Sequence, residues 1–155
     1  MYKSLSILSA LVSITLVLVS FIPKDKISNT ANVTGVKNEG ISFIEADWNK
    51  ALAEAKKQHK LIVLDAYTSW CGPCKQLKKN TFSDKAAGEF FNTNYVNVAI
   101  DMEKGFGPVL LEKYGINAFP TLLIIDENGK KVSFTRGFIP AEILIEFGKD
   151  GLAKK

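Results

Sequence analysis

The chain holds two cysteines, both within the string Trp-Cys-Gly-Pro-Cys at residues 70–74. Two thiols three positions apart can close to a disulfide and open again, so the pair can act as a redox couple. An apolar, strand-like run at residues 61–67 precedes the string, and a helix-favouring run at residues 75–79 follows it. Cys71 is therefore expected at a helix N-terminus, where unpaired N–H groups and the helix dipole stabilise a thiolate. Cys74, one turn later on the same face, can then attack a mixed disulfide formed at Cys71.

Three other interpretations of the two cysteines compete with the redox couple. A structural disulfide that closes so short a loop would stabilise the fold by only about 2 kcal/mol. A zinc site needs about four Cys or His ligands, and besides the cysteines the chain offers only His59, in a distant polar stretch. Two buried, inert thiols are the third alternative. We favour the redox couple, expect no metal site, and expect His59 to be a solvated residue at a helix end.

Several separate matches make the chain resemble the thioredoxin family over about residues 41–150. The string at 70–75, Trp-Cys-Gly-Pro-Cys-Lys, is the active-site motif of that family. Asp65, six residues before the first cysteine, falls where the family keeps a buried acid. The string Phe-Pro-Thr at 119–121 falls where it keeps a cis-proline loop that faces the dithiol, and Gly137 matches a glycine of the substrate groove. The resemblance implies a thioredoxin fold and a thiol–disulfide exchange activity.

The expected catalytic residues are Cys71, Cys74 and Asp65. Cys71 attacks the substrate and Cys74 resolves the mixed disulfide. A carboxyl group inside an apolar strand is costly to ionise and tends to have a raised pKa, which suits proton exchange with the thiol of Cys74. In many thioredoxins a lysine on the neighbouring strand accompanies this acid. The corresponding position here is Asn97, so we expect that helper to be absent.

Substrate binding is expected around the dithiol. The resemblance implies a cis bond before Pro120 and a loop that pairs with an extended substrate peptide by β-addition. Trp70 is expected to be exposed docking surface, and Phe119 is bulkier than the residue often found before this proline. The Gly-Pro pair between the cysteines resembles reducing members of the family more than oxidising ones. The expected substrate-binding residues are Trp70, Gly72, Pro73, Phe119, Pro120 and Gly137.

Two further strings, at residues 77–84 and 101–116, resemble the C-terminal thioredoxin-like domain of bacterial periplasmic thiol:disulfide interchange proteins. The resemblance implies an exported, monomeric protein-disulfide reductase that exchanges disulfides with envelope proteins. An upstream electron donor, such as a membrane reductant, would recharge it. No bound cofactor is expected because the dithiol is the redox group. Net oxidation or isomerisation, a non-catalytic binding module, and dedicated cytochrome c maturation stay open as alternatives.

Composition and the N-terminus bear on compartment. With 155 residues, 46% of them hydrophobic, the chain is long enough for one well-packed domain, and a net charge of +4 without a basic aromatic stripe does not indicate nucleic-acid binding. An uncharged hydrophobic stretch runs from Leu5 to Ile22 and indicates export, with a cleaved signal peptide and a membrane anchor both open. We assign residues 1–22 to that segment, 23–40 to a flexible linker and 41–155 to the thioredoxin-like domain, in the periplasm or cell envelope.

The order of the predicted elements, βαβαββα, implies an α/β domain with a mixed central sheet and helices on both faces. This agrees with the thioredoxin fold that the resemblance implies. The turn string Asn-Gly at 128–129 predicts that the last two strands form a hairpin. Besides a helix that starts at the cysteine motif, the predicted helices lie at residues 46–58, 84–91, 108–114 and 141–149. The predicted strands lie at residues 41–44, 61–67, 95–100, 121–125 and 131–135.

Overall fold

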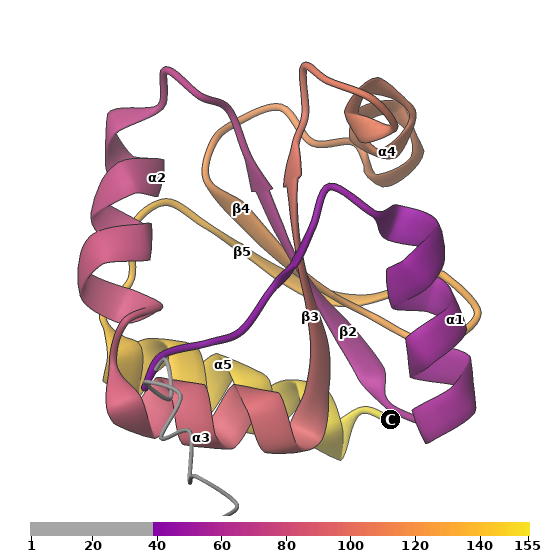
Figure 1. Ribbon diagram of the computed structural model, residues 1–155, viewed down its shortest axis with the longest axis vertical. Coiled ribbons are helices and arrows are strands. Elements are labelled where there is room, and N and C mark those ends of the chain that lie inside the picture. Colours follow the sequence, from indigo (N-terminus) through magenta and orange to yellow (C-terminus); the bar gives the residue numbers. More distant parts are fainter. Residues whose placement is uncertain (1–38) are drawn as a thin grey trace, which may run out of the picture. The chain divides into compact units, whose positions relative to one another are not determined.

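The computed structural model describes residues 39–155, so the hydrophobic segment at 1–22 and nearly all of the linker at 23–40 lie outside the described residues. Five strands form one mixed sheet in the order β1-β3-β2-β4-β5 (Figure 1). The pairs β1–β3 and β3–β2 are parallel, and the pairs β2–β4 and β4–β5 are antiparallel. The strands are β1 (Ile44–Glu45), β2 (Leu61–Tyr67), β3 (Tyr95–Asp101), β4 (Thr121–Ile125) and β5 (Lys131–Arg136).

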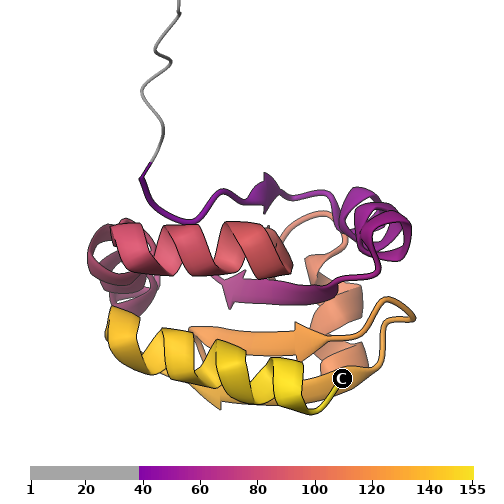
Figure 2. The same ribbon diagram turned by 90° about the horizontal axis from the view of Figure 1, so that it is seen from below.

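Helices cover both faces of this sheet, and Figure 2 shows α3 and α5 side by side across one of them. Within residues 39–155, none of the helices combines the length and the apolar character needed to cross a membrane. The helices on one face are α1 (Trp48–Gln58) and α4 (Gly107–Tyr114). The other face carries α2 (Gly72–Gln76), a π-helical turn η1 (Leu77–Thr81), α3 (Lys85–Asn94) and α5 (Ala141–Ala153).

The central strand β2 explains why two separate cores form. Its side chains alternate between the two faces, so Ile62 and Leu64 pack with α1 and α4, while Leu61 and Val63 pack with η1, α3 and α5. A near-continuous apolar run is what a strand buried on both faces requires. The predicted α/β architecture, with a mixed sheet and helices on both faces, is confirmed. Asp65 is the exception in this run, and it lies on the face of α2 and α3.

The predicted strand at residues 41–44 is wrong in its extent, because β1 contains only Ile44–Glu45. Ile41 donates its N–H instead to the carbonyl of Phe82 at 2.7 Å. The chain is therefore bound to the end of η1 before it reaches the sheet, and only its last residues pair with β3.

Three helices differ from their predicted ranges by two residues or more. α3 extends to Asn94 rather than residue 91. α1 begins at Trp48 rather than residue 46, because the carboxylate of Asp47 accepts the N–H of Lys50 at 2.9 Å and caps the helix there. α5 extends to Ala153 rather than residue 149. Gly151 lets this extra turn pack closely against β4, since an added Cβ there would collide with the side chain of Ile124.

A close backbone approach joins the start of the domain to α3. Gly88 lies against residues 39–40, and an added Cβ would come within 2.6 Å of the carbonyl carbon of Gly40. A Cβ on Gly40 would in turn lie 2.8 Å from the Cα of Ser83. Both glycines are therefore required by lack of space rather than by backbone angles.

Replacing Gly88 with Ala should destabilise the protein by roughly 1–3 kcal/mol, because overpacking against backbone outweighs the gain of about 1 kcal/mol in helix propensity. Urea unfolding of the oxidised protein measures the difference. Glu89→Ala, at an exposed neighbouring position of the same helix, is the matched control and should change the unfolding free energy by less than about 0.5 kcal/mol. An equally stable Gly88→Ala protein would show that the 39–40 segment moves aside without cost.

Candidate active site

The two cysteines lie at the start of α2 and form a disulfide, with their Cα atoms 5.3 Å apart. Cys71 is the N-cap residue, and its Sγ accepts the backbone N–H of Cys74 at 3.1 Å. Pro73 stands in the first turn, where its missing N–H leaves no hydrogen bond unmade. The sulfur of Cys71 therefore occupies the position where a helix N-terminus favours negative charge. The predicted place of Cys71 is confirmed.

The far end of the α2–η1 segment is fixed to the rest of the domain. Thr81 is fully buried, and its hydroxyl donates to the carbonyl of Ile139, just before α5, at 2.6 Å. Leu77, also fully buried, packs into the core of that face. These contacts fix the C-terminal end of the cysteine-bearing segment to the core of the domain. Sequence reasoning missed Thr81, since a threonine at a helix end carries no signal that its partner lies 58 residues away.

Asp65 lies in the middle of the sheet, beside Ala99 of β3 and Leu122 of β4. Only 7% of its surface is exposed, and its Oδ1 has no hydrogen-bond partner within residues 39–155. Burial and, to a smaller extent, the negative charge of Glu45 raise the pKa of this carboxyl group, the positive charge of Lys78 lowers it, and the net result is about 7. Asp65 therefore changes its charge near neutral pH, as the sequence predicts for a carboxyl group inside an apolar strand.

Asn97 occupies the β3 position where many thioredoxins carry a lysine. Its amide group donates to the carbonyl of Ser42 at 3.3 Å and to Oδ1 of Asn92 at 3.2 Å. It thus binds the chain before β1 and helix α3. The cation that acts on Asp65 comes from Lys78 of η1 instead.

The loop before β4 lies next to the dithiol end of β2, because Thr121 pairs with Ala66 in the antiparallel ladder. The bond between Phe119 and Pro120 is cis, as expected. The carbonyl of Pro120 accepts the N–H of Gly137 at 2.9 Å. Gly137 has a φ of +82°, which glycine adopts without strain. Gly137 therefore supports the proline loop through its backbone.

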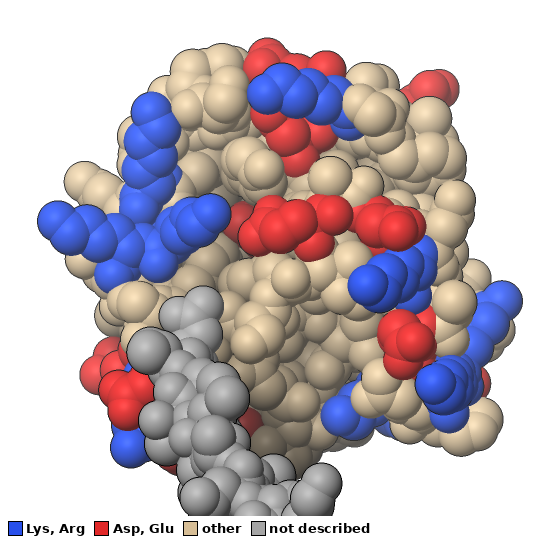
Figure 3. All heavy atoms as spheres, viewed as in Figure 1, with Lys and Arg blue, Asp and Glu red and all other residues tan. Residues whose placement is uncertain are grey.

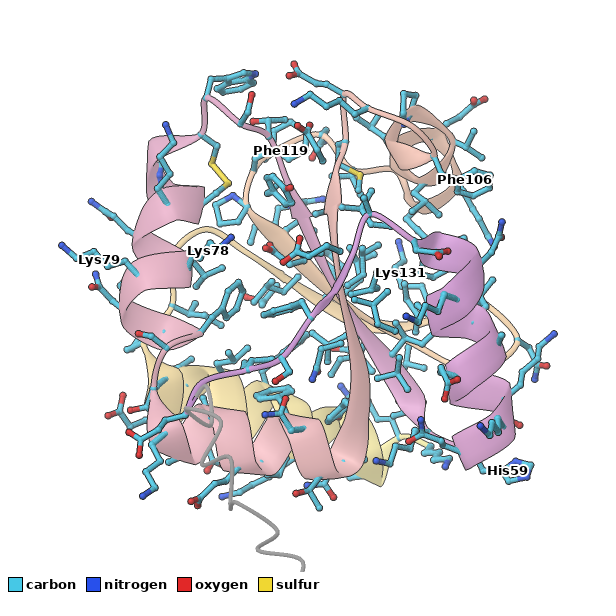
Figure 4. The ribbon with its side chains drawn as sticks, in the orientation of Figure 1. His59, Lys78, Lys79, Phe106, Phe119 and Lys131 are labelled. Atoms are coloured by element: carbon cyan, nitrogen blue, oxygen red, sulfur yellow. A yellow bond between two sulfur atoms is a disulfide. The ribbon has the colours of Figure 1, made fainter. Side chains whose placement is uncertain are left out.

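Trp70 links three loops at this end of the molecule. Its side chain is 65% exposed, and its indole N–H is shared between the two carboxylate oxygens of Glu103 at 3.0 and 3.1 Å. Its ring stands edge-on to that of Phe119, with 6.1 Å between centroids. Figure 4 shows Phe119 and Phe106 at the end of the molecule that carries the disulfide, with His59 at the opposite end. The side chain of His59 is exposed there, as predicted.

Glu103 was not among the predicted site residues, although it lies in a string that carries the family resemblance. The carboxylate of Asp101 positions it by accepting the N–H of Glu103 at 3.0 Å and pairing with Lys104 at 3.1 Å. Spacing along the sequence gives no sign that this loop meets Trp70, because the two are 33 residues apart.

A hollow of about 640 Å³ opens beside the dithiol, between the α2–η1 segment and β1. In Figure 3, lysine side chains over α2 and η1 stand next to carboxylates on this face of the molecule. The hydroxyl of Thr68, in its wall, is buried and has no partner among the described residues. The residues that line the hollow include Glu45, Asp65, Thr68, Cys74, Lys78 and Ala99.

A family model described as a thioredoxin-like domain matches residues 48–151. Among curated relatives, the thiol:disulfide interchange protein DsbD of Haemophilus influenzae strain PittEE is 27% identical in an alignment of 124 residues that covers 74% of this chain and 21% of that protein. The chain thus spans about a fifth of the length of the first curated relatives it matches.

Two solved structures have a similar fold. A Bacteroides thetaiotaomicron protein proposed to be a disulphide-isomerase is 41% identical with a TM-score of 0.66, over 75% of this chain and 96% of that one. The oxidised C-terminal domain of Neisseria meningitidis DsbD is 24% identical with a TM-score of 0.59, over 70% and 98% of the two chains, and this likeness concerns the fold alone. The chain therefore belongs to the thioredoxin-like family, as a member whose Cys71–Cys74 pair supports thiol–disulfide oxidoreductase activity.

Proposed function

We propose that the protein is an exported thiol–disulfide oxidoreductase that reduces disulfides in proteins of the cell envelope. The observation that carries this proposal is the position of the Cys-Gly-Pro-Cys disulfide, with Cys71 as the helix N-cap and Cys74 in the same pocket as the buried Asp65. This arrangement supports Cys71 as the attacking cysteine and Cys74 as the cysteine that passes its proton to Asp65.

The reaction follows from these two environments. The Cys71 thiolate attacks one sulfur of a substrate disulfide, so that a mixed disulfide forms and the second substrate sulfur leaves as a thiolate. The thiol of Cys74 then passes its proton to the carboxylate of Asp65 and attacks the sulfur of Cys71. The mixed disulfide breaks, the Cys71–Cys74 disulfide forms, and the substrate leaves as a dithiol after protonation by water. The substrate gains two electrons, and an upstream electron donor must reduce the protein again.

Residues around the dithiol would bind the substrate. Trp70 offers an exposed aromatic surface, and Gly72 and Pro73 are exposed beside it. The backbone before Pro120 would pair with an extended substrate segment by β-addition, with Phe119 beside it. The name of the DsbD relatives, thiol:disulfide interchange protein, supports protein thiols and disulfides as partners.

Two observations bear on direction and compartment. The pair Gly72-Pro73 favours reduction of substrate disulfides. The Bacteroides thetaiotaomicron relative, proposed to be a disulphide-isomerase, supports disulfide isomerisation as the second candidate function. The hydrophobic stretch at residues 5–22 supports export. In the envelope, a membrane reductant would serve as the electron donor. We propose that the protein acts as a monomer.

The reduction potential of the Cys71–Cys74 couple tests the direction of electron flow. Equilibrating residues 23–155 with defined thiol–disulfide buffers should give a value near that of thioredoxin, about −270 mV. A value near that of the strong periplasmic oxidants, about −120 mV, would contradict the reductase and favour an oxidant.

Single cysteine variants test the order of the steps. Cys74→Ser should accumulate a mixed disulfide with a disulfide-containing protein, because the attacking thiolate remains and the resolving thiol is gone. Cys71→Ser should form little or none and should lose at least about 10³-fold in reductase rate. Mass spectrometry of the trapped species and an insulin-reduction assay measure the two effects. A binding module would keep its function in both variants.

Replacing Asp65 with Asn tests the raised pKa through stability. The folded protein releases this proton near pH 7 and the unfolded chain near about pH 4, so the stability of the wild type should fall as pH rises between these values. Above pH 7 the loss is complete, and the Asn variant should be more stable there by up to about 4 kcal/mol. Denaturation of the oxidised proteins at pH 4 and pH 8 measures this. The exposed Asp150→Asn variant should follow the wild type at both values.

A further inference from the structure

Three residues form a row across the sheet beneath the hollow. Glu45 of β1 and Asp65 of β2 both pair with Ala99 of β3, one from each side. Residues in register across neighbouring strands present their side chains on the same face. Two strand spacings separate the two acids by roughly 10 Å. The small side chain of Ala99 leaves the space between them open, and all three residues line the hollow.

A lysine faces this row from the opposite wall. Lys78 lies on η1 and lines the same hollow. Figure 4 shows Lys78 directed from the helix toward the sheet, whereas the neighbouring Lys79 is directed away from it. Neither Lys78 nor Glu45 belongs to an ion pair in the part of the chain that the structure describes. Both charges therefore act through the hollow rather than neutralising a surface partner.

Asp65 is the group on which these charges act. Its unpaired Oδ1 and the unpaired hydroxyl of Thr68 both belong to the wall of the hollow. The remaining titratable groups in that wall are Tyr67 at the end of β2, Cys74 of α2 and Lys75 of α2. The lysine that many thioredoxins place on β3 is missing, because that position is Asn97.

We propose that Glu45 and Lys78 are positioning residues that face Asp65 from opposite walls of this hollow and control, in opposite directions, when Asp65 can accept the proton of Cys74. The proposal rests on the proposed role of Asp65 in resolving the mixed disulfide. The signs of the two effects do not depend on that role, because the charge of Glu45 raises the pKa of Asp65 and the charge of Lys78 lowers it. Ionised Asp65 is the proton acceptor, so Lys78 extends the resolving step to lower pH and Glu45 restricts it to higher pH.

The direct test is an NMR titration of the Asp65 carboxyl carbon in the oxidised protein, in which neither cysteine titrates. Lys78→Gln should raise the midpoint of Asp65 by roughly 0.3–1 pH unit, and Glu45→Gln should lower it by a similar amount. Lys78→Arg, which keeps the charge, should restore the wild-type midpoint. Lys79→Gln is the matched control and should move it by less than about 0.2 pH unit.

The charge-preserving variant separates charge from altered packing. Because Asp65 is buried, added salt should weaken both shifts only in part. A Lys78→Arg midpoint that stays shifted like that of Lys78→Gln, shifts of the same sign for Lys78→Gln and Glu45→Gln, or a Lys78→Gln shift no larger than that of Lys79→Gln would overturn the proposal.

The pH dependence of the resolving step links the titration to the reaction. In the reduced protein, the pH midpoint for release of a model substrate from the mixed disulfide should move up in Lys78→Gln and down in Glu45→Gln by about as much as the Asp65 midpoint. An unchanged kinetic midpoint beside a shifted titration would overturn the role in catalysis. The titration needs no turnover, so its failure is distinguishable from failure of the reductase proposal, which the reduction potential decides.

Discussion

The geometry of the site depends on the pairing of β2 with β3 on one side and with β4 on the other. This double pairing fixes the register of Asp65 against Ala99 and Leu122. It also places the end of β2, from which the cysteine string continues, next to the cis-proline loop that precedes β4. A slip of one residue would turn Asp65 to the opposite face, away from Cys74. The backbone hydrogen bonds of the sheet therefore fix where the residues of the site lie.

Burying Asp65 in that ladder opposes folding, and the rest of the domain must offset the cost. The apolar residues of β2 pack into separate cores on the two faces, so the strand stays buried although one of its side chains is a carboxyl group without a hydrogen-bond partner among the described residues. A buried polar atom left unpaired weakens stability and is more common at functional sites than elsewhere in a protein. The raised pKa of Asp65 is the chemical consequence of that burial.

Much of the fold and of the dithiol could be predicted from the sequence because their signals are local. The cysteine spacing, the acid in an apolar run and the helix start at Cys71 each lie within one segment. The contacts of Glu103 with Trp70 and of Thr81 with Ile139 could not be predicted, since each joins segments that only the folded chain brings together. The short β1 was mispredicted for the same reason. The expected roles of the substrate-binding residues stay predictions.

The two cysteines, although they are bonded to each other, have different surroundings. Cys74 lines the hollow that holds Asp65, Glu45 and Lys78, and Cys71 does not. Trp70, with Phe119 edge-on to it, directly precedes Cys71, whose own side chain is buried. One helical turn therefore separates the aromatic side of the cysteine pair from the side that faces the carboxyl group. In the proposed reaction, a protein substrate would dock on the aromatic side, beside Trp70 and Phe119, and the proton of Cys74 would move to Asp65 on the other.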